Sequence, residues 1–280
     1  MTLYAGIDGG QSGTSAAIGD GERVLGRGHA GPADEVGAGP GSTRLREALE
    51  TALAGAVRDA GLPPRTHFET IAAGISGYEG RIYGAAPRLP ADRVILMHDA
   101  PIAHAGAFGG GSGVAVIAGT GSVAYARAGD GRTCTAGGWG YCFGDEGSAF
   151  WIARQAIERA IDGDGALERS MLEFFGSGSL RALARSFYSG ELTRERFASY
   201  AARALAWEEI AGGAAEALAR LAERAVIELP CALAFCGGLL RDVRFAERVH
   251  RAARARLPSC SVTEPLADPA EGALILARQA

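Results

Sequence analysis

The chain has 280 residues, of which 48% are hydrophobic and 21% are charged, and its formal net charge is −4. This length can bury a sizeable core as one large domain or two smaller ones, and no basic excess favours nucleic acid or an acidic membrane as a partner. The sequence shows no apolar stretch of membrane-spanning length and no basic-then-apolar start typical of a signal peptide, so we expect a cytoplasmic location.

The sequence contains no lysine and no asparagine. A Walker A loop, a protein kinase and a pyridoxal enzyme each need a lysine, so these mechanisms are excluded, and any nucleotide must be bound by another route. The five cysteines lack C-x-x-C spacing and the five histidines lack metal-ligand spacing. We therefore expect reduced thiols and no site built from these residues.

The first predicted element lies in "LYAGIDGGQSGTSAAI" (3–18), where two apolar runs flank a turn of glycines and hydroxyls. This pattern predicts a strand, a turn and a second strand, with Asp8 at the end of the first strand. The segment "STRLREALETALAGAVRDAG" (42–61) has an apolar stripe at helical spacing. Two buried strands that each lead into a turn are predicted at 70–77 and 92–101.

From 147 to 229 the pattern is mostly helical, and a short strand is expected at 231–238, before a helix at 241–257. The last segment, 268–279, begins with Asp268 and a proline, which is typical of a capped helix start.

A repeat spaced by 110 residues connects two parts of the chain. "AGIDGGQSGTSAAIGDGERVLGRG" (5–28) matches "AVIAGTGSVAYARAGDGRTCTAGG" (115–138) at nine positions, whereas chance would give about two. Each copy predicts three strands, with a Gly-Asp-Gly turn that suits a hairpin with positive φ. The first copy has Asp8 where the second has Ala118, so both turns are expected to hold one ligand while one manages its cation.

The ordered motifs "IDGGQSGTSA", "HDA", "IAGTGSVAYA", "AGGWGYCFGDEGSA" and "FCGG" resemble those of the N-acetylglucosamine kinase family over nearly the whole chain. That family belongs to the sugar kinase/actin/heat-shock-chaperone ATPase superfamily. The resemblance implies an α/β protein with a duplicated ribonuclease-H-like (actin-like ATPase) fold, whose two domains flank a central cleft. We expect the first domain at 1–105, completed by a returning helix at 268–280, and the second, with helical additions, at 106–267.

Asp8 would lie beside the phosphates of ATP, where a carboxylate is repelled unless a cation intervenes, so we interpret it as the Mg²⁺ residue. The structural alternative is an aspartate that satisfies its own turn. Backbone amides and hydroxyls would bind the phosphates, because glycine allows close approach of the backbone; ordinary hairpin turns are the alternative. The predicted phosphate residues are Gly9, Gly10, Ser12 and Thr14 in the first copy and Gly119, Thr120, Gly121 and Ser122 in the second.

By resemblance, Asp99 is the catalytic base that accepts the proton of the sugar hydroxyl during attack on the γ-phosphate. A helix N-cap is the structural alternative for this residue. Gly237 and Gly238 match the adenosine motif of the family, although a helix cap or a turn would also use glycine there.

The loop "GGWGYCFGDEGSA" (137–149) resembles the sugar-recognition loop. It implies that Trp139 packs beside the N-acetyl group and that Asp145 accepts hydrogen bonds from sugar hydroxyls, with Gly138 and Glu146 nearby. A core tryptophan and two acidic residues that cap the following helix are the alternative. Ser76 matches a family position near the sugar but also suits a structural turn.

The chain departs from the family where a sugar-binding asparagine is usual, since it offers Asp34 or Glu35 instead. The substrate therefore stays open among N-acetylglucosamine, glucosamine and N-acetylmuramate, with the 6-hydroxyl as acceptor. We expect a small-molecule amino sugar as partner, no nucleic acid or membrane, and a homodimer as an open expectation. A different alternative is an ATPase activator of a 2-hydroxyacyl-CoA dehydratase, although Cys134 and Cys142 do not form that group's cysteine motif.

Overall fold

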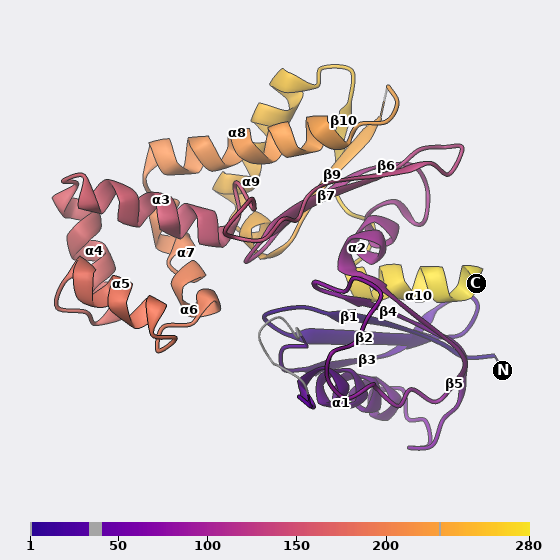
Figure 1. The fold of residues 1–280 in the computed structure, drawn as a ribbon. Helices are drawn as coiled ribbons and strands as arrows, with labels where there is room; N and C mark the ends of the chain where they lie inside the picture. The colour runs from indigo at the N-terminus through magenta and orange to yellow at the C-terminus, as the bar shows by residue number, and fades with distance from the viewer. Residues whose placement is uncertain (1, 34–40, 230) are drawn as a thin grey trace. The chain divides into compact units, whose positions relative to one another are not determined.

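Two five-stranded sheets organise the chain, and the computed structural model describes residues 2–33, 41–229 and 231–280. The chain divides into two units (Figure 1). Unit 1 comprises Met1–Ala115, Arg127–Arg132 and Glu264–Ala280, and unit 2 comprises Val116–Ala126 and Thr133–Thr263.

The first sheet has the strand order β3-β2-β1-β4-β5. Its strands are β1 (Tyr4–Gly9), β2 (Thr14–Gly19), β3 (Val24–Ala30), β4 (Phe68–Ile75) and β5 (Ala91–His98). Strand β2 is antiparallel to β1 and β3, whereas β4 runs parallel to both β1 and β5. The three parallel strands therefore end at the same edge of the sheet.

The second sheet has the order β10-β9-β6-β7-β8. Its strands are β6 (Gly113–Ala118), β7 (Ser122–Arg127), β8 (Thr133–Gly137), β9 (Ala232–Cys236) and β10 (Ser261–Thr263). Starting from β3 in the first sheet and from β8 in the second, both sheets have the same order, in which the third, second and first strands are followed by the fourth and the fifth. The duplication predicted from the 110-residue repeat is thereby confirmed, with Ile7 in β1 and Ile117 in β6 as one matched pair.

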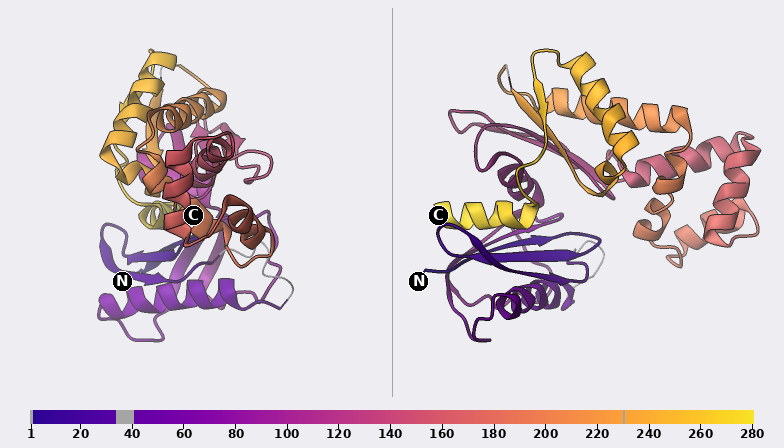
Figure 2. Two further views of the ribbon diagram at one scale, coloured as in Figure 1. Left: turned by 90° about the vertical axis from the view of Figure 1, so that its left-hand side faces the viewer. Right: turned by 180° about the vertical axis from the view of Figure 1, so that it is seen from behind.

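Helices α1 (Arg44–Asp59) and α10 (Pro269–Gln279) cover opposite faces of the first sheet (Figures 1 and 2). A Cβ on Gly28 of β3 would collide with the α1 backbone at Ala52, and a Cβ on Gly6 of β1 would collide with the α10 backbone at Ala270 and Leu274. Helix α2 (Asp99–Phe108) packs against α10 and β4. The chain thus returns after residue 263 to complete unit 1.

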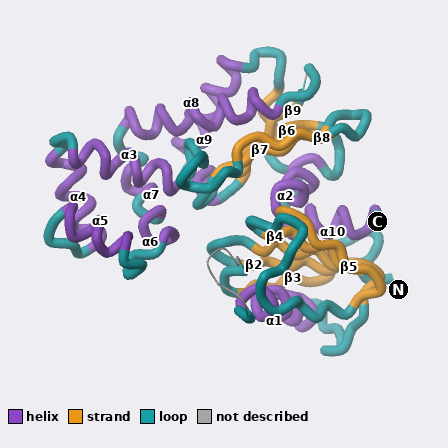
Figure 3. Tube along the Cα trace, in the orientation of Figure 1, coloured by secondary structure: helices purple, strands orange, loops and turns teal. Residues whose placement is uncertain are grey.

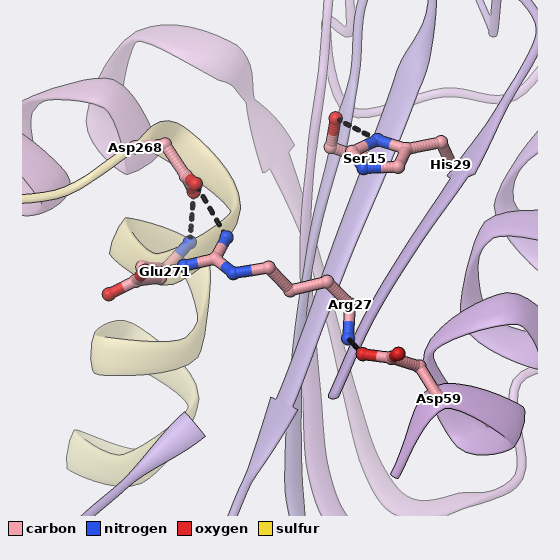
Figure 4. A network of polar contacts seen from close by, with 6 residues as sticks. All are labelled: Ser15, Arg27, His29, Asp59, Asp268 and Glu271. Atoms are coloured by element: carbon pink, nitrogen blue, oxygen red, sulfur yellow. Dashed lines mark hydrogen bonds and ion pairs between the residues drawn. The ribbon is translucent and has the colours of Figure 1, made fainter. Parts of the chain in front are cut away.

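Arg27 on β3 fixes the start of α10 (Figure 4). Its guanidinium donates to Asp268 Oδ2 at 2.6 Å and also pairs with Glu271, while its backbone N–H donates to Asp59 Oδ2 of α1 at 2.8 Å. Asp268 caps α10 by accepting from the Glu271 N–H at 2.9 Å, as the sequence predicts.

The remaining helices belong mainly to unit 2, and Figure 3 shows the long helical stretch between β8 and β9. They are α3 (Ala149–Ile161), α4 (Gly165–Phe175), α5 (Leu180–Tyr188), α6 (Arg194–Ala198), α7 (Ala201–Ala204), α8 (Glu208–Ala225), the 3₁₀ helix η1 (Gly238–Arg241) and α9 (Val243–Arg256). Among the described residues, none of these helices combines the length and the apolar character needed to cross a membrane.

One local expectation is wrong. The first Gly-Asp-Gly turn, at 19–21, has no positive φ, and the Asp20 carboxylate accepts from the N–H groups of Glu22 and Arg23. In the second turn Gly131 does adopt positive φ, at 88°. Asp130 also accepts from a backbone N–H, that of Arg132, so the aspartate bond is common to both copies and the glycine conformation differs between them.

Candidate active site

Three predicted site residues lie at the edge where the parallel strands of unit 1 end. Asp8 is the second-to-last residue of β1, Ser76 directly follows β4, and Asp99 directly follows β5. Asp8 is paired in register with Gly74, and Ile75 with His98, so the three positions belong to neighbouring strand ends. Crevices at the carboxyl ends of parallel strands are where open α/β sheets bind ligands.

The two carboxylates of this edge influence each other. Burial, followed by the negative charges of Asp99 and Asp268, raises the pKa of Asp8 from 3.8 to about 7. The Asp8 carboxyl group is therefore poorly solvated and lies near other carboxylates. An ionised Asp8 therefore needs a compensating cation.

Asp99 is the first residue of α2, and the N-cap is His98, whose Nδ1 lies 3.2 Å from the Ala100 nitrogen. The simple capping alternative for Asp99 is therefore wrong. The Asp99 side chain is 25% exposed, but its Oδ1 is buried and, within the described chain, accepts no hydrogen bond of good geometry. His98 Nδ1 lies 2.8 Å from this oxygen.

The first glycine turn is closed by its own backbone. The Gly10 N–H donates to Gly13 O at 2.9 Å, and the Ser76 N–H donates to Gly9 O at 2.9 Å. Thr14 is buried, and its hydroxyl donates to Gly31 O at 2.8 Å, whereas Ser12 is exposed. In the described part of the chain, the N–H groups at positions 11–13 have no backbone partner, so the tip of the turn retains free donors.

The second glycine turn rests on the start of α3. Gly119 O and Thr120 O accept from the N–H groups of Ala149 and Phe150 at 2.9 and 3.3 Å, and the Gly119 N–H donates to Gly121 O. The Ser122 N–H is taken by Asp145 Oδ1 at 3.2 Å. Of the four predicted phosphate residues here, only Thr120 and Gly121 keep an N–H without a partner among the described residues.

Asp145 is buried and has φ of 61°, the one non-glycine residue with positive φ in the described ranges. Burial raises the pKa of its carboxyl, although N–H groups of Ser122 and Gly140 donate to it. Left-handed backbone at a non-glycine residue is strained and is frequent at functional sites. Ser148, and not Asp145 or Glu146, caps α3, so the capping alternative is wrong.

Trp139 is 72% exposed, which excludes the core-tryptophan alternative. It lies in a tight turn in which Gly140 O accepts from the N–H groups of Phe143 and Gly144, and Phe143 is also exposed. Gly138 connects the start of this loop to the second turn, because its N–H donates to Ser122 O at 3.1 Å. Glu146 is exposed, and its carbonyl accepts from the Ser122 hydroxyl.

Gly237 and Gly238 lie where β9 ends and η1 begins. Gly237 has φ of 108°, and a Cβ there would collide with Ala118 O, so only glycine fits. A Cβ on Gly238 would meet nothing within 4 Å, so its backbone faces open space. Asp34 and Glu35, the predicted replacements for a sugar-binding asparagine, lie outside the described residues.

Sequence reasoning overlooked two contributors. His98 stands inside the quoted "HDA" motif, and its place at a strand-to-helix junction beside a carboxylate was the available signal. Asp268 was expected only as a helix cap, and its electrostatic effect on Asp8 depends on a contact between segments 260 residues apart, which no local pattern encodes.

Two sheets of the same strand order, each with a glycine turn after its first strand and the first with carboxylates at its strand ends, define the actin-like ATPase fold. The chain belongs to the BadF/BadG/BcrA/BcrD ATPase family, whose model matches residues 5–277. The predicted fold and the superfamily resemblance are confirmed, and the family implies that the chain uses ATP.

Three known proteins are similar to this chain in sequence or in fold. An N-acetylmuramic acid/N-acetylglucosamine kinase of Clostridium acetobutylicum is 31% identical over 207 residues, which cover 66% of this chain and 67% of that protein. A structure from Chromobacterium violaceum, provisionally named an N-acetylglucosamine kinase, is 28% identical with a TM-score of 0.80 and 99% coverage of both chains. A similarly named protein of Porphyromonas gingivalis, 19% identical with a TM-score of 0.69 over 99% and 98% of the chains, shares the fold.

Proposed function

We propose that the protein is an ATP-dependent amino-sugar kinase that transfers the γ-phosphoryl group of ATP to the 6-hydroxyl of N-acetylglucosamine or a close relative. The observation that carries this proposal is the placement of two carboxylates, Asp8 and Asp99, at the carboxyl edge of one sheet, close enough for the charge of Asp99 to raise the pKa of Asp8. The name of the Clostridium relative supports the same activity.

Asp99 is proposed as the catalytic base. The sugar oxygen forms a bond to the γ-phosphorus, the bond from that phosphorus to the bridging oxygen of ADP breaks, and the hydroxyl proton passes to the Asp99 carboxylate. Such positioned base catalysis contributes about 10²–10⁴-fold. The Asp99 side chain is 25% exposed although its Oδ1 is buried, so part of this carboxyl group is open to a substrate.

Asp8 is proposed to hold Mg²⁺. The described residues contain no group of three His, Cys, Asp or Glu that could form a metal cage. Mg²⁺ does not require one, because it keeps several waters and uses one or two carboxylates together with substrate phosphates. A carboxylate whose pKa is raised by burial and neighbouring charge fits such a cation. When bound, Mg²⁺ neutralises charge on the phosphates.

The phosphates are proposed to bind amides of the two glycine turns. In the first turn the free N–H groups at 11–13 and the exposed Ser12 hydroxyl are the donors, and Gly9 and Gly10 shape the turn. In the second turn Thr120 and Gly121 supply the free N–H groups. The Thr14 hydroxyl already donates to Gly31 O, so Thr14 is proposed to stabilise the turn and not to bind the phosphates through this hydroxyl. Gly237 and Gly238 are proposed to contact adenosine.

The sugar is proposed to contact Ser76 and the loop that contains Gly138, Trp139, Asp145 and Glu146. An exposed indole offers a flat apolar surface for the C–H face of a sugar or an N-acetyl group. N-Acetylmuramate is a second candidate substrate, because the Clostridium relative is named for both sugars. The alternative of a glucosamine kinase depends on Asp34 and Glu35. A homodimer and a cytoplasmic location remain predictions.

The test is ADP release, measured in a coupled assay with N-acetylglucosamine, N-acetylmuramate, glucosamine, N-acetylmannosamine and glucose. We expect turnover with one or more N-acetylated sugars and little with glucose. Iron content and colour of anaerobically purified protein test the activator alternative, which requires an iron–sulfur cluster. ADP release that is independent of every sugar would contradict the kinase proposal.

A further inference from the structure

The side chains of His98 and Asp99 meet where β5 ends and α2 begins. His98 has extended backbone, with φ of −63° and ψ of 154°, and Asp99 is the first helical residue. His98 Nδ1 lies 2.8 Å from Asp99 Oδ1 and 3.2 Å from the Ala100 nitrogen. The same ring nitrogen therefore lies beside a hydrogen-bond acceptor, Asp99 Oδ1, and a hydrogen-bond donor, the Ala100 N–H.

An imidazole nitrogen carries either a lone pair or a proton. With a lone pair, Nδ1 accepts the Ala100 N–H and faces the lone pairs of an ionised Asp99 at 2.8 Å, which is repulsive. With a proton, Nδ1 donates to Asp99 Oδ1 and gives up the cap. Asp99 Oδ1 is buried and, among the described residues, accepts no hydrogen bond of good geometry, so a proton on His98 Nδ1, 2.8 Å away, would supply the donor that the ionised carboxylate lacks.

The charged groups around His98 and Asp99 also favour a proton on His98. Asp8 on β1 interacts electrostatically with Asp99 and Asp268, and Glu79, in the loop after β4, interacts with His98. These neighbours are all carboxylates, so a proton on His98 offsets local negative charge. The hydrogen bond to Asp99 and the charges of Asp99 and Glu79 raise the pKa of His98 against the effect of burial.

We propose that His98 is the positioning residue of Asp99: its Nδ1 proton holds Oδ1 of the ionised carboxylate and leaves Oδ2 to take the proton of the sugar hydroxyl. This inference rests on the proposed kinase function for its catalytic part. The pairing itself depends only on the geometry of unit 1.

The protonation states of Asp99 and His98 are defined at each stage of the transfer. Before transfer, Asp99 is a carboxylate and His98 carries the Nδ1 proton. During transfer, the substrate proton moves to Asp99 Oδ2 and His98 keeps its own proton. A donor at Oδ1 stabilises the ionised form of the base, and loss of His98 removes this stabilisation. The acid limb of the kcat/KM profile then moves to higher pH.

The pairing is tested by NMR titration of the imidazole signals in wild-type protein and in Asp99→Asn. The His98 signal is assigned by its loss in His98→Asn, since the chain has four other histidines. We expect Asp99→Asn to lower the pKa of His98. An unchanged His98 pKa would overturn the proposal.

Three substitutions separate positioning from helix capping. His98→Leu removes both functions, His98→Asp keeps an acceptor for the Ala100 N–H but has no donor, and His98→Asn supplies both an amide donor and an acceptor. We expect His98→Leu and His98→Asp to lower kcat about tenfold or more near neutral pH, with an acid limb moved to higher pH and little change in sugar KM. His98→Asn should restore most of the rate.

The outcomes distinguish a failure of the His98–Asp99 pairing from a failure of the proposed kinase function. Equal rates for His98→Asp and His98→Asn would mean that His98 only caps α2, and this would overturn the proposal even if His98→Leu failed to fold. If no sugar supports ADP release while Asp99→Asn still lowers the pKa of His98, the kinase function fails and the pairing stands.

Discussion

The Ser122 N–H donates a hydrogen bond of 3.2 Å to the carboxylate of Asp145, which lies 23 residues further along the chain. The second glycine turn and the proposed sugar loop are therefore connected directly. Asp145 reaches this position with left-handed backbone, and the Ser122 hydroxyl adds a second connection through Glu146 O at 2.9 Å. A sugar contact at Asp145 would thus be transmitted to a proposed phosphate-binding turn within unit 2.

Gly121 allows this connection, so its replacement is the first prediction. A Cβ at Gly121 would lie 2.7 Å from Asp145 Oδ2, and Gly121→Ala must displace the buried carboxylate. We expect a loss of about 1–3 kcal/mol in the free energy of unfolding, measured by urea denaturation. Gly119→Ala is the matched control, because a Cβ there meets nothing within 4 Å. Equal losses in the two variants would contradict the arrangement.

The second prediction concerns the pH dependence of stability. Since the pKa of Asp8 is about 7 in the folded protein and about 3.8 when unfolded, the folded state binds the extra proton between these values. The contribution of Asp8 is therefore most favourable near pH 4 and is lost as pH rises through 7. Asp8→Asn should remove this slope and stabilise the protein at pH 8 by at most about 4 kcal/mol.

Urea unfolding of wild type and Asp8→Asn at pH 5.5 and pH 8 measures this effect. The two proteins should differ more at pH 8, and parallel pH curves would contradict the raised pKa of Asp8. In the presence of ADP, Mg²⁺ should raise the Tm of wild type more than that of Asp8→Asn, because the variant lacks the anionic ligand.

The third prediction tests the packing of the returning helix α10. A Cβ on Gly6 would collide with backbone atoms of Ala270 and Leu274, which flexible side-chain movement cannot relieve. Gly6→Ala should cost more than about 3 kcal/mol in the free energy of unfolding. Gly21→Ala serves as the control, since a Cβ there meets nothing within 4 Å. A Gly6→Ala protein as stable as this control would show that α10 does not pack on β1.

Much of the fold was predictable because hydrophobic period and duplication are local or repeated signals. The leucine stripe of 42–61 became α1, and the Asp268-Pro269 start became the cap of α10. The turn at 19–21 was mispredicted because the same three residue types, Gly-Asp-Gly, have positive φ at Gly131 in the second copy and no positive φ in the first, although the aspartate bonds to the backbone in both. These three residues alone therefore do not determine the conformation of the turn.

The residues of the candidate site were predictable from the sequence, but their hydrogen-bond partners were not. Thr14 and Ser122 are in the predicted motifs, yet their polar groups are taken by Gly31 O, Asp145 and Glu146 O. Such bonds join segments far apart in the sequence. The same reason hid the effect of Asp268 on Asp8.

The central claim, that Asp99 is the base of a sugar kinase, is tested most directly by sugar-dependent ADP release in wild type and Asp99→Asn. We predict turnover in wild type with an N-acetylated amino sugar, and a kcat about 10²–10⁴-fold lower in Asp99→Asn, with sugar binding by calorimetry largely retained. A variant that turns over sugar at nearly the wild-type rate would contradict the account.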